Sequence, residues 1–292
     1  MGVAARTGTL YLVGTPIGNL GDLSDRARKT LTSVDVVACE DTRRTGRLLA
    51  SFGIPAPRLV SFFEGNERER GPELIRMLRE GSDVAVVSDA GMPALSDPGY
   101  RLVAACVEHG IPVDVVPGPS AAVAALVVSG LPTDRFVFEG FLPRSGRARA
   151  ERLGALEHEI RTIVLFESPR RLARTLSDLA VALGSDRRAV VARELTKLHQ
   201  EFVRGRLAEL AAGMGALKGE VVVVVEGRGA KPPAAPEDAV RLAVALVSEG
   251  MRMREAARRV AAETGVPSGR IYTGLIAMKR RSEPPGSGAK PR

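Results

Sequence analysis

Short segments rich in β-branched apolar residues alternate with helical patterns along most of this 292-residue chain. The clearest example is Val84–Val87, which is followed by Ser88, Asp89 and a loop of glycine and proline that ends at Gly99. Strands that alternate with helices in this way are typical of a mostly parallel sheet. In such sheets ligands bind beyond the carboxyl ends of the strands, so these loops are the expected place for a site.

The alternation predicts an α/β fold in two α/β domains, followed by a small helical appendage that resembles a helix-turn-helix. The expected domains are residues 9–136 and 137–227, a Gly/Pro linker 228–237, a basic helical segment 238–281 and a disordered tail 282–292. Strands are expected at Thr9–Val13, Val34–Ala38, Leu59–Phe63, Val84–Val87, Ile111–Val116, Phe136–Gly140, Thr162–Phe166, Arg187–Ala192 and Glu220–Val225.

The positive charge of the chain is concentrated at its carboxyl end. Of the net charge of +8, residues 227–292 carry +7, from 13 Lys/Arg against 6 Asp/Glu. Such asymmetry favours a polyanionic partner, most simply a nucleic acid, although a solvated arginine-rich surface explains the charge alone equally well.

Several classes of protein are disfavoured by what the sequence lacks. No apolar run reaches the ~20 residues of a membrane helix, and no signal peptide is recognisable, so we expect no membrane association. The two cysteines, Cys39 and Cys106, fit a reducing cytoplasm and no metal site. Neither a Walker A loop nor a G-x-G-x-x-G motif is present, and the three histidines lie far from any nucleophile elbow.

Six strand ends carry the polar and small residues from which a site could be built. They are residues 14–20, 40–44, 88–99, 117–122, 167–171 and 193–197. A single polar strand end is more often a helix cap or a turn than a site. Six of them on one rim of parallel strands favour a shared binding cleft.

These segments also resemble a known family. The stretches LYLVGTPIGNLGDLSDRA, ACEDTRRTGRLL, VSDAGMPALSDPGYRLV, PGPSAAVAALVVSGLP, FEGFLP, FESPRRL and ARELTK occur in this order between Thr9 and Gly227. This order is similar to that of the small-subunit ribosomal RNA methyltransferase I group of the tetrapyrrole methylase (class III) superfamily. The resemblance implies two α/β domains with S-adenosylmethionine in the cleft between them, a homodimer, and methylation of a cytidine ribose 2′-hydroxyl in the decoding centre of 16S rRNA.

The resemblance also implies which positions would contact the cofactor. They are Thr15, Pro16, Asp89, Ala90, Gly91, Pro93, Ser120, Ala121 and Ser168. A carboxylate such as Asp89 suits an amino group or a ribose hydroxyl, and Gly91 allows the backbone to approach closely. The segment Asp97–Gly99 is expected to shape the turn rather than to contact a substrate.

The residue that accepts the proton of the 2′-hydroxyl is less defined by the sequence. Lys197 and Glu194 are the first candidates, with Asp41 and Glu67 behind them. An ion pair of Glu194 with Arg193 that braces the domain interface explains Glu194 equally well. Contacts to RNA phosphates are expected from Arg43, Arg44, Arg170, Arg252, Arg254, Arg258, Arg259 and Arg280.

Two other functions remain open at this point. A class III methyltransferase acting on a tetrapyrrole or another small substrate would use the same fold, but would not need a basic appendage. A non-catalytic nucleic-acid-binding protein would use the carboxyl-terminal helices and leave the six strand ends unexplained.

Overall fold

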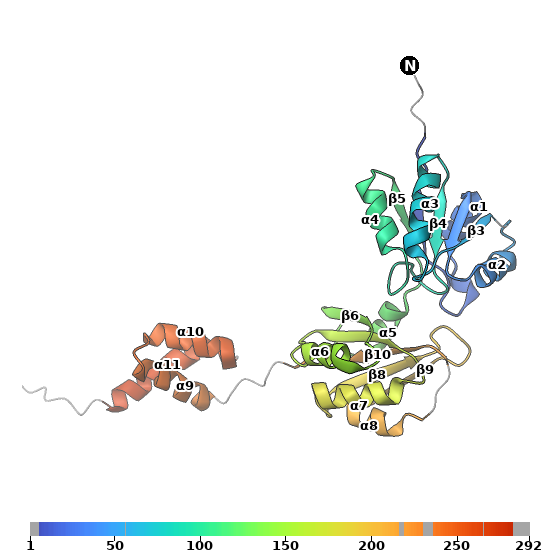
Figure 1. Ribbon diagram of the computed structural model, residues 1–292. Coiled ribbons are helices and arrows are strands. Elements are labelled where there is room, and N and C mark those ends of the chain that lie inside the picture. Colours follow the sequence, from blue (N-terminus) through green and yellow to red (C-terminus); the bar gives the residue numbers. More distant parts are fainter. Residues whose placement is uncertain (1–5, 56, 216–218, 230–235, 265, 283–292) are drawn as a thin grey trace, which may run out of the picture. The chain divides into compact units, whose positions relative to one another are not determined.

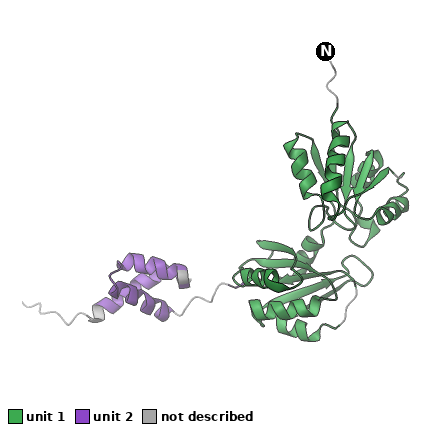
Figure 2. Ribbon diagram, in the orientation of Figure 1, with its two compact units in different colours: residues 1–227 green, residues 228–292 purple. Residues whose placement is uncertain are grey.

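The computed structural model describes residues 6–55, 57–215, 219–229, 236–264 and 266–282. The chain divides into two compact units, residues 1–227 and residues 228–292 (Figure 2). The first unit contains two five-stranded sheets, and the second unit is helical (Figure 1). Most of the predicted linker 228–237 and of the predicted tail 282–292 lies outside the described residues.

The first sheet is entirely parallel, with strand order β3-β2-β4-β1-β5. Its strands are β1 (Leu10–Val13), β2 (Val36–Cys39), β3 (Arg58–Ser61), β4 (Val84–Val87) and β5 (Val113–Val116). The central strands are buried on both faces, which explains why β4 is apolar throughout rather than alternating. All five carboxyl ends therefore lie along one edge of this sheet.

Helices cover both faces of the first sheet. On one face α3 (Glu67–Arg79) and α4 (Tyr100–Glu108) pack against Leu10, Val84 and Val86. On the other face α1 (Asp25–Ser33) and α2 (Thr42–Ser51) pack against Val37, Ala85 and Val87. A short helix, η1 (Leu20–Asp22), follows the loop after β1.

Local capping fixes where two of these helices begin. The Ser24 hydroxyl accepts a hydrogen bond from the Ala27 amide at the start of α1, as is typical of a serine that precedes a helix. The Asp41 carboxylate accepts the amides of Arg43 and Arg44 at the start of α2. This bonding lowers the pKa of Asp41, so its carboxylate caps the helix and stays charged at neutral pH.

The second sheet is mixed, with strand order β6-β7-β10-β8-β9. Its strands are β6 (Phe136–Phe141), β7 (Thr162–Glu167), β8 (Arg188–Arg193), β9 (Glu201–Arg206) and β10 (Val221–Val225). Strand β10 is antiparallel to both β7 and β8, so the carboxyl ends of β7 and β8 lie at the same edge as the amino end of β10.

Alternate residues of the second sheet face two different helical layers. Ile163, Val191 and Val223 pack with α6 (Gly146–Leu156), α7 (Leu172–Leu183) and α8 (Leu207–Gly213). Val164, Val190 and Val222 pack with α5 (Ala121–Ser129) on the other face. Helix α5 begins directly after the loop that follows β5, so it connects the site-bearing edge of the first sheet to the second sheet.

Strand β9 is not among the strands that the sequence predicts, and helix α3 contains Pro72.

The second unit is a three-helix bundle of α9 (Pro236–Ser248), α10 (Met253–Thr264) and α11 (Ser268–Ser282). Its core is formed by small and branched side chains at helical spacing, among them Ala239, Ala256, Val260, Ile271 and Leu275.

Candidate active site

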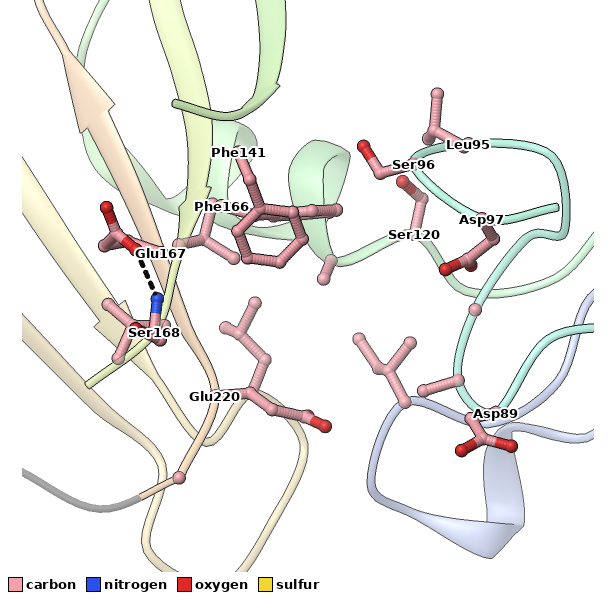
Figure 3. Close-up of a pocket in the computed structure, with 18 of the residues that line it drawn as sticks. Asp89, Leu95, Ser96, Asp97, Ser120, Phe141, Phe166, Glu167, Ser168 and Glu220 are labelled. Carbon is pink, nitrogen blue, oxygen red and sulfur yellow. Dashed lines mark hydrogen bonds between the residues drawn. The ribbon is translucent and has the colours of Figure 1, made fainter. Parts of the chain in front are cut away.

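A cavity of about 380 Å³ lies in the first unit, where the loops after β4, β5 and β7 meet the amino end of β10. We call it the first cavity. Figure 3 shows Asp89, Asp97 and Ser120 on one side of it, and Phe166, Ser168 and Glu220 on the other. Apolar side chains make up much of its lining, including Ile17, Leu95, Phe141, Phe166, Leu195 and Val222. A partly apolar cavity with a few polar groups is typical of a small-molecule site.

The loop after β4 is held in place by the loop after β1. Thr15 and Gly91 exchange two backbone hydrogen bonds, of 2.9 and 3.1 Å, and the Thr15 hydroxyl donates to the Ser88 carbonyl at 3.2 Å. Gly91 has a φ of 87°, a conformation that favours glycine, and a Cβ atom there would lie 3.3 Å from Cγ2 of Ile17 and 3.4 Å from the Pro119 carbonyl oxygen. Thr15 is buried and positions this loop without lining the first cavity.

Asp89 is the charged group at the centre of this loop. Its Oδ2 atom lies 2.6 Å from Nη1 of Arg44. Its Oδ1 atom is buried and has no hydrogen-bond partner among the described residues. Because a buried carboxylate oxygen without a partner is costly, Oδ1 is suited to accept a hydrogen bond from a bound molecule.

Glu40 and Asp97 form a pair of carboxyl groups beside Asp89. Burial raises the pKa of Glu40 to about 7, and the charges of Asp97 and Asp89 add to this effect. Burial likewise raises the pKa of Asp97 to about 6, against hydrogen bonds to Ser88 and Glu40 that lower it. One of the two carboxyls can therefore carry a proton near neutral pH.

The ends of β1 and β5 approach each other through two glycines. A Cβ atom at Gly118 would lie 2.8 Å from the Cα of Gly14, and one at Gly14 would lie 2.6 Å from the Cα of Gly118. The Gly118 amide also points at Sδ of Met92, at 3.3 Å. This contact brings the loop before α5, with Ser120 and Ala121, against the loop that carries Asp89.

A buried ion-pair network supports the opposite wall. The Glu167 side chain is fully buried and accepts hydrogen bonds from Arg171 at 2.7 and 2.9 Å and from Thr175 at 2.6 Å. Burial alone would raise the pKa of Glu167, but these bonds hold it below its usual value. Arg171 also donates to the Leu142 carbonyl, so the network ties the end of β6, near Phe141, to the end of β7.

Arg149 of α6 extends this network through Thr175. Its side chain is 5% exposed and donates to Asp178, Thr175 and the Pro143 carbonyl. Both of the charges at the centre of the network, on Glu167 and Arg149, are thus paired and hydrogen-bonded, as buried charges require.

Lys197 and Glu194 form a salt bridge beside Glu220, which lines the first cavity, whereas Arg193 pairs with Glu201 and not with Glu194. Nζ of Lys197 lies 3.0 Å from Glu194 and 3.1 Å from Glu220. Partial burial lowers the pKa of Lys197, but the bonds to the two glutamates outweigh this effect and raise it. The Glu220 amide and then Lys197 lower the pKa of Glu194. In this arrangement Lys197 is therefore an ammonium group at neutral pH and Glu194 a carboxylate.

A second cavity, of about 400 Å³, adjoins the first and shares Ile17, Asp89, Ala90 and Glu220 with it. Its other walls come from the loop after β1, from α2 and from the loop after β8, and include Pro16, Arg44, Arg47, Leu48 and Lys197. It is lined by three cationic side chains, whereas none lines the first cavity.

The structure brings most of the predicted positions together. Of the nine predicted cofactor positions, six line the first cavity: Asp89, Ala90, Gly91, Ser120, Ala121 and Ser168. Pro16 lines the second cavity, while Thr15 and Pro93 are buried beside the loop. Glu40 and Asp97 lie in two of the six predicted strand-end segments, but Asp97 was expected only to shape the turn. Asp97 lines the first cavity, and its distance in sequence from Glu40 leaves no local signal of their contact.

The predicted RNA-contacting arginines lie in two places. Arg43, Arg44 and Arg170 are exposed in the first unit. Arg252, Arg254, Arg258 and Arg259 are exposed on the second unit, and the side chain of Arg280 lies outside the described part of the chain.

The described residues include no group of three or more His, Cys, Asp or Glu side chains suited to hold a metal ion. None of the helices in the described ranges is both long enough and apolar enough to cross a membrane.

Comparison with known proteins agrees with the order of motifs in the sequence. Residues 9–211 match the family model of the tetrapyrrole (corrin/porphyrin) methylases. A protein of Synechocystis sp. is 47% identical over 91% of this chain and 96% of its own length, and one of Thermotoga maritima is 52% identical over 76% of this chain and 99% of its own length. Both are named ribosomal RNA small subunit methyltransferase I.

The fold is also found among solved structures. A uroporphyrin-III C-methyltransferase from Thermus thermophilus, complexed with S-adenyl homocysteine, matches with a TM-score of 0.54 at 23% identity. The match covers 75% of this chain and 97% of that one.

Proposed function

We propose, because this chain belongs to the tetrapyrrole methylase family and to its ribosomal RNA small subunit methyltransferase I group, that it methylates small-subunit ribosomal RNA with S-adenosylmethionine as methyl donor. We propose further that the acceptor is the 2′-hydroxyl of a cytidine ribose in the decoding centre of 16S rRNA. The observation that carries the proposal is the identity of 47–52% to relatives of this name. It is joined by a cavity that is lined by the strand-end segments in which the sequence predicts a site.

The first cavity fits the methyl donor in size and in chemistry. Its aromatic and aliphatic wall suits an adenine ring, with Ser120 and Ala121 leaving room for it. The unpartnered Oδ1 of Asp89 suits a hydroxyl or amino group of the donor, and the turned backbone at Gly91 allows close approach. We therefore assign Asp89, Ala90, Gly91, Ser120, Ala121 and Ser168 to donor binding, with Thr15, Pro16 and Pro93 shaping the loops around them.

S-adenosylmethionine supplies a methyl group on a positively charged sulfur that leaves readily as a thioether. The protein must then mainly align the acceptor oxygen with that methyl group and exclude water, so positioning carries much of the acceleration. The Thr15–Gly91 bridge and the Glu167–Arg171 network hold the two walls that would do this.

Lys197 and Glu194 are proposed as the catalytic pair. Since the pKa of Lys197 is raised, its ammonium group would stabilise negative charge that develops on the ribose oxygen, while Glu194 and Glu220 hold it in place. The 2′-hydroxyl proton would pass to a carboxylate or to water at the junction of the two cavities.

RNA binding is proposed for the exposed arginines of both units. The relative from Thermotoga maritima is matched over 99% of its length by 223 residues, so its length is about that of the first unit alone. The second unit is therefore best understood as an accessory that adds phosphate contacts through Arg252, Arg254, Arg258, Arg259 and Arg280, rather than as part of the catalytic site.

A homodimer is also proposed. Val123, Val127 and Val128 of α5 are 39–63% exposed, and Val123 and Val127 share one face of the helix. Such a cluster of exposed apolar side chains is suited to be covered by a second copy of the chain.

Methyl incorporation would distinguish this function from the two alternatives. The protein is incubated with labelled S-adenosylmethionine and either small ribosomal subunits from a strain that lacks it or a tetrapyrrole such as uroporphyrinogen III. The proposal predicts label in the RNA alone. Label in the tetrapyrrole would support a small-molecule methyltransferase, and no label with retained RNA binding would support a non-catalytic protein.

A further inference from the structure

The second cavity adjoins the first through a shared wall. Ile17, Asp89, Ala90 and Glu220 line both cavities, so the two cavities meet at these four residues. Transfer of a group between two substrates requires such adjoining sites. The first cavity is proposed for the methyl donor, and the second is therefore placed to hold the acceptor.

The charges of the second cavity differ from those of the first. Arg44, Arg47 and Lys197 line the second cavity, against the carboxylates of Asp89 and Glu220. Arg44 is paired with Asp89, and Lys197 with Glu194 and Glu220. Arg47 forms no ion pair with any described residue, and its Nε atom donates a long hydrogen bond, of 3.4 Å, to the Arg43 carbonyl. The cavity thus has one exposed guanidinium whose charge is not balanced.

We propose that the second cavity binds the phosphodiester of the acceptor nucleotide, with Arg47 as its main anionic contact. The inference rests on the proposed function, because it takes the acceptor to be RNA. Arg47 binds a phosphate adjacent to the target ribose, and the ribose hydroxyl then lies at the shared wall beside Asp89 and Ala90. Lys197 lines the same cavity, which places its ammonium group beside the acceptor oxygen.

A phosphodiester fits this cavity better than other anions for two reasons. The planar guanidinium group of arginine offers paired donors that match phosphate oxygens. In addition, Arg43 lies one helical turn before Arg47 on α2, is also exposed, and forms no ion pair with another described residue. Two exposed guanidinium groups at i and i+4 on one helix suit successive phosphates of a strand rather than a single small anion.

The test is charge reversal at Arg47. The full-length variant Arg47→Glu is compared with wild type and with Arg28→Glu, which makes the same charge change on α1 at a side chain that is 53% exposed and lines neither cavity. A third variant, Arg47→Lys, retains the charge without the paired donors. For each protein we measure the binding of small ribosomal subunits and the KM and kcat for their methylation. The affinity for S-adenosylmethionine is measured by calorimetry.

Arg47→Glu is expected to weaken subunit binding and raise KM about tenfold, with the affinity for S-adenosylmethionine and the midpoint of thermal unfolding unchanged. The slope of log K against log salt should fall by about 0.7 to 0.9, as for one lost phosphate contact. Arg28→Glu should match wild type, and Arg47→Lys should lie between wild type and Arg47→Glu.

Two results would overturn the inference in distinguishable ways. If wild type methylates RNA and Arg47→Glu does so with unchanged KM and salt slope, the cavity does not hold the phosphodiester although the proposed function stands. If wild type methylates no RNA, the proposed function itself fails, and this inference fails with it.

Discussion

Nη1 of Arg44 lies 2.6 Å from Oδ2 of Asp89, and this pair joins the first turn of α2 to the loop after β4. The pair occupies one carboxylate oxygen of Asp89 and leaves the other buried without a partner among the described residues. Arg44 is 53% exposed and Asp89 only 24%, so the ion pair orients the carboxylate more than it stabilises the fold. Asp89 is thereby held ready for a ligand at the wall that the two cavities share.

Replacement of Asp89 by Asn should therefore weaken donor binding more than it affects stability. A hydrogen bond to a charged group is worth about 1.5–3 kcal/mol, so the Kd for S-adenosylmethionine should rise roughly 10- to 100-fold. Isothermal titration calorimetry measures this change. The matched control is Asp114→Asn, which removes an exposed carboxylate paired with Arg26 at 2.9 Å and should leave the Kd unchanged. Equal affinities of both variants would exclude Asp89 from the donor site.

The acidic pair of Glu40 and Asp97 should make stability fall as pH rises through the neutral range. Both groups have pKa values in the folded state, about 7 and about 6, above their ordinary values of 4.5 and 3.8. The folded protein therefore binds more protons than the unfolded chain between about pH 4 and pH 7. The stability due to this binding is fully present below pH 4 and is lost as pH rises through 6 and 7.

The variant Glu40→Gln tests this pH dependence. It should flatten the decrease in unfolding free energy between pH 5 and pH 8, by on the order of 2 kcal/mol, as followed by urea denaturation. Glu108→Gln on the exposed face of α4 should leave the wild-type slope in place. The carboxyls with lowered pKa, such as Glu167 and Glu194, instead make stability fall as pH decreases. They do so below their ordinary pKa of 4.5, outside the range of pH 5 to pH 8. A slope that persists in Glu40→Gln would contradict the assignment.

Removal of Arg171 should destabilise the wall that carries Ser168. Arg171→Met leaves the fully buried Glu167 carboxylate with only Thr175 and the Ser168 amide as partners. Loss of one partner of a buried ion pair costs about 3 kcal/mol, which urea unfolding would detect. Arg174→Met, one turn from Arg171 on the exposed face of α7, should change the unfolding free energy by less than about 0.5 kcal/mol.

Deletion of residues 228–292 should separate RNA binding from donor binding. The first unit keeps both cavities, since all of their lining residues lie before residue 228. The truncated protein should bind S-adenosylmethionine with wild-type affinity in calorimetry, but bind small-subunit RNA more weakly in a filter-binding assay. An equal loss of both affinities would contradict the accessory role of the second unit.

Local sequence pattern was sufficient to predict most of the fold. The β-branched runs at Val84–Val87 and Val221–Val225 are buried on both faces, so their composition identifies them as central strands without reference to the rest of the chain. Strand β9 was not predicted, because its half-exposed pattern, EFVRGR, is weakly apolar and lies at a sheet edge.

The site was less predictable than the fold, for a physical reason. Asp89 and Gly91 could be identified because a strand end and a turn are local features. The contact between Glu40 and Asp97 depends on β2 and β4 being neighbours in the sheet, which brings together residues 57 positions apart. Similarly, the pairing of Lys197 with Glu220 requires that β10 run antiparallel beside β8. No local pattern contains that information.

The most direct measurement identifies the methylated nucleoside. Small ribosomal subunits from a strain that lacks this protein are incubated with it and S-adenosylmethionine, and the 16S rRNA is then digested to nucleosides and analysed by mass spectrometry. The proposed function predicts one new species, 2′-O-methylcytidine, at one site in the decoding centre. Methylation of a base would contradict it. An RNA that gains no methyl group would also contradict it, provided that subunits from the native strain, analysed as a control, contain the methylated nucleoside.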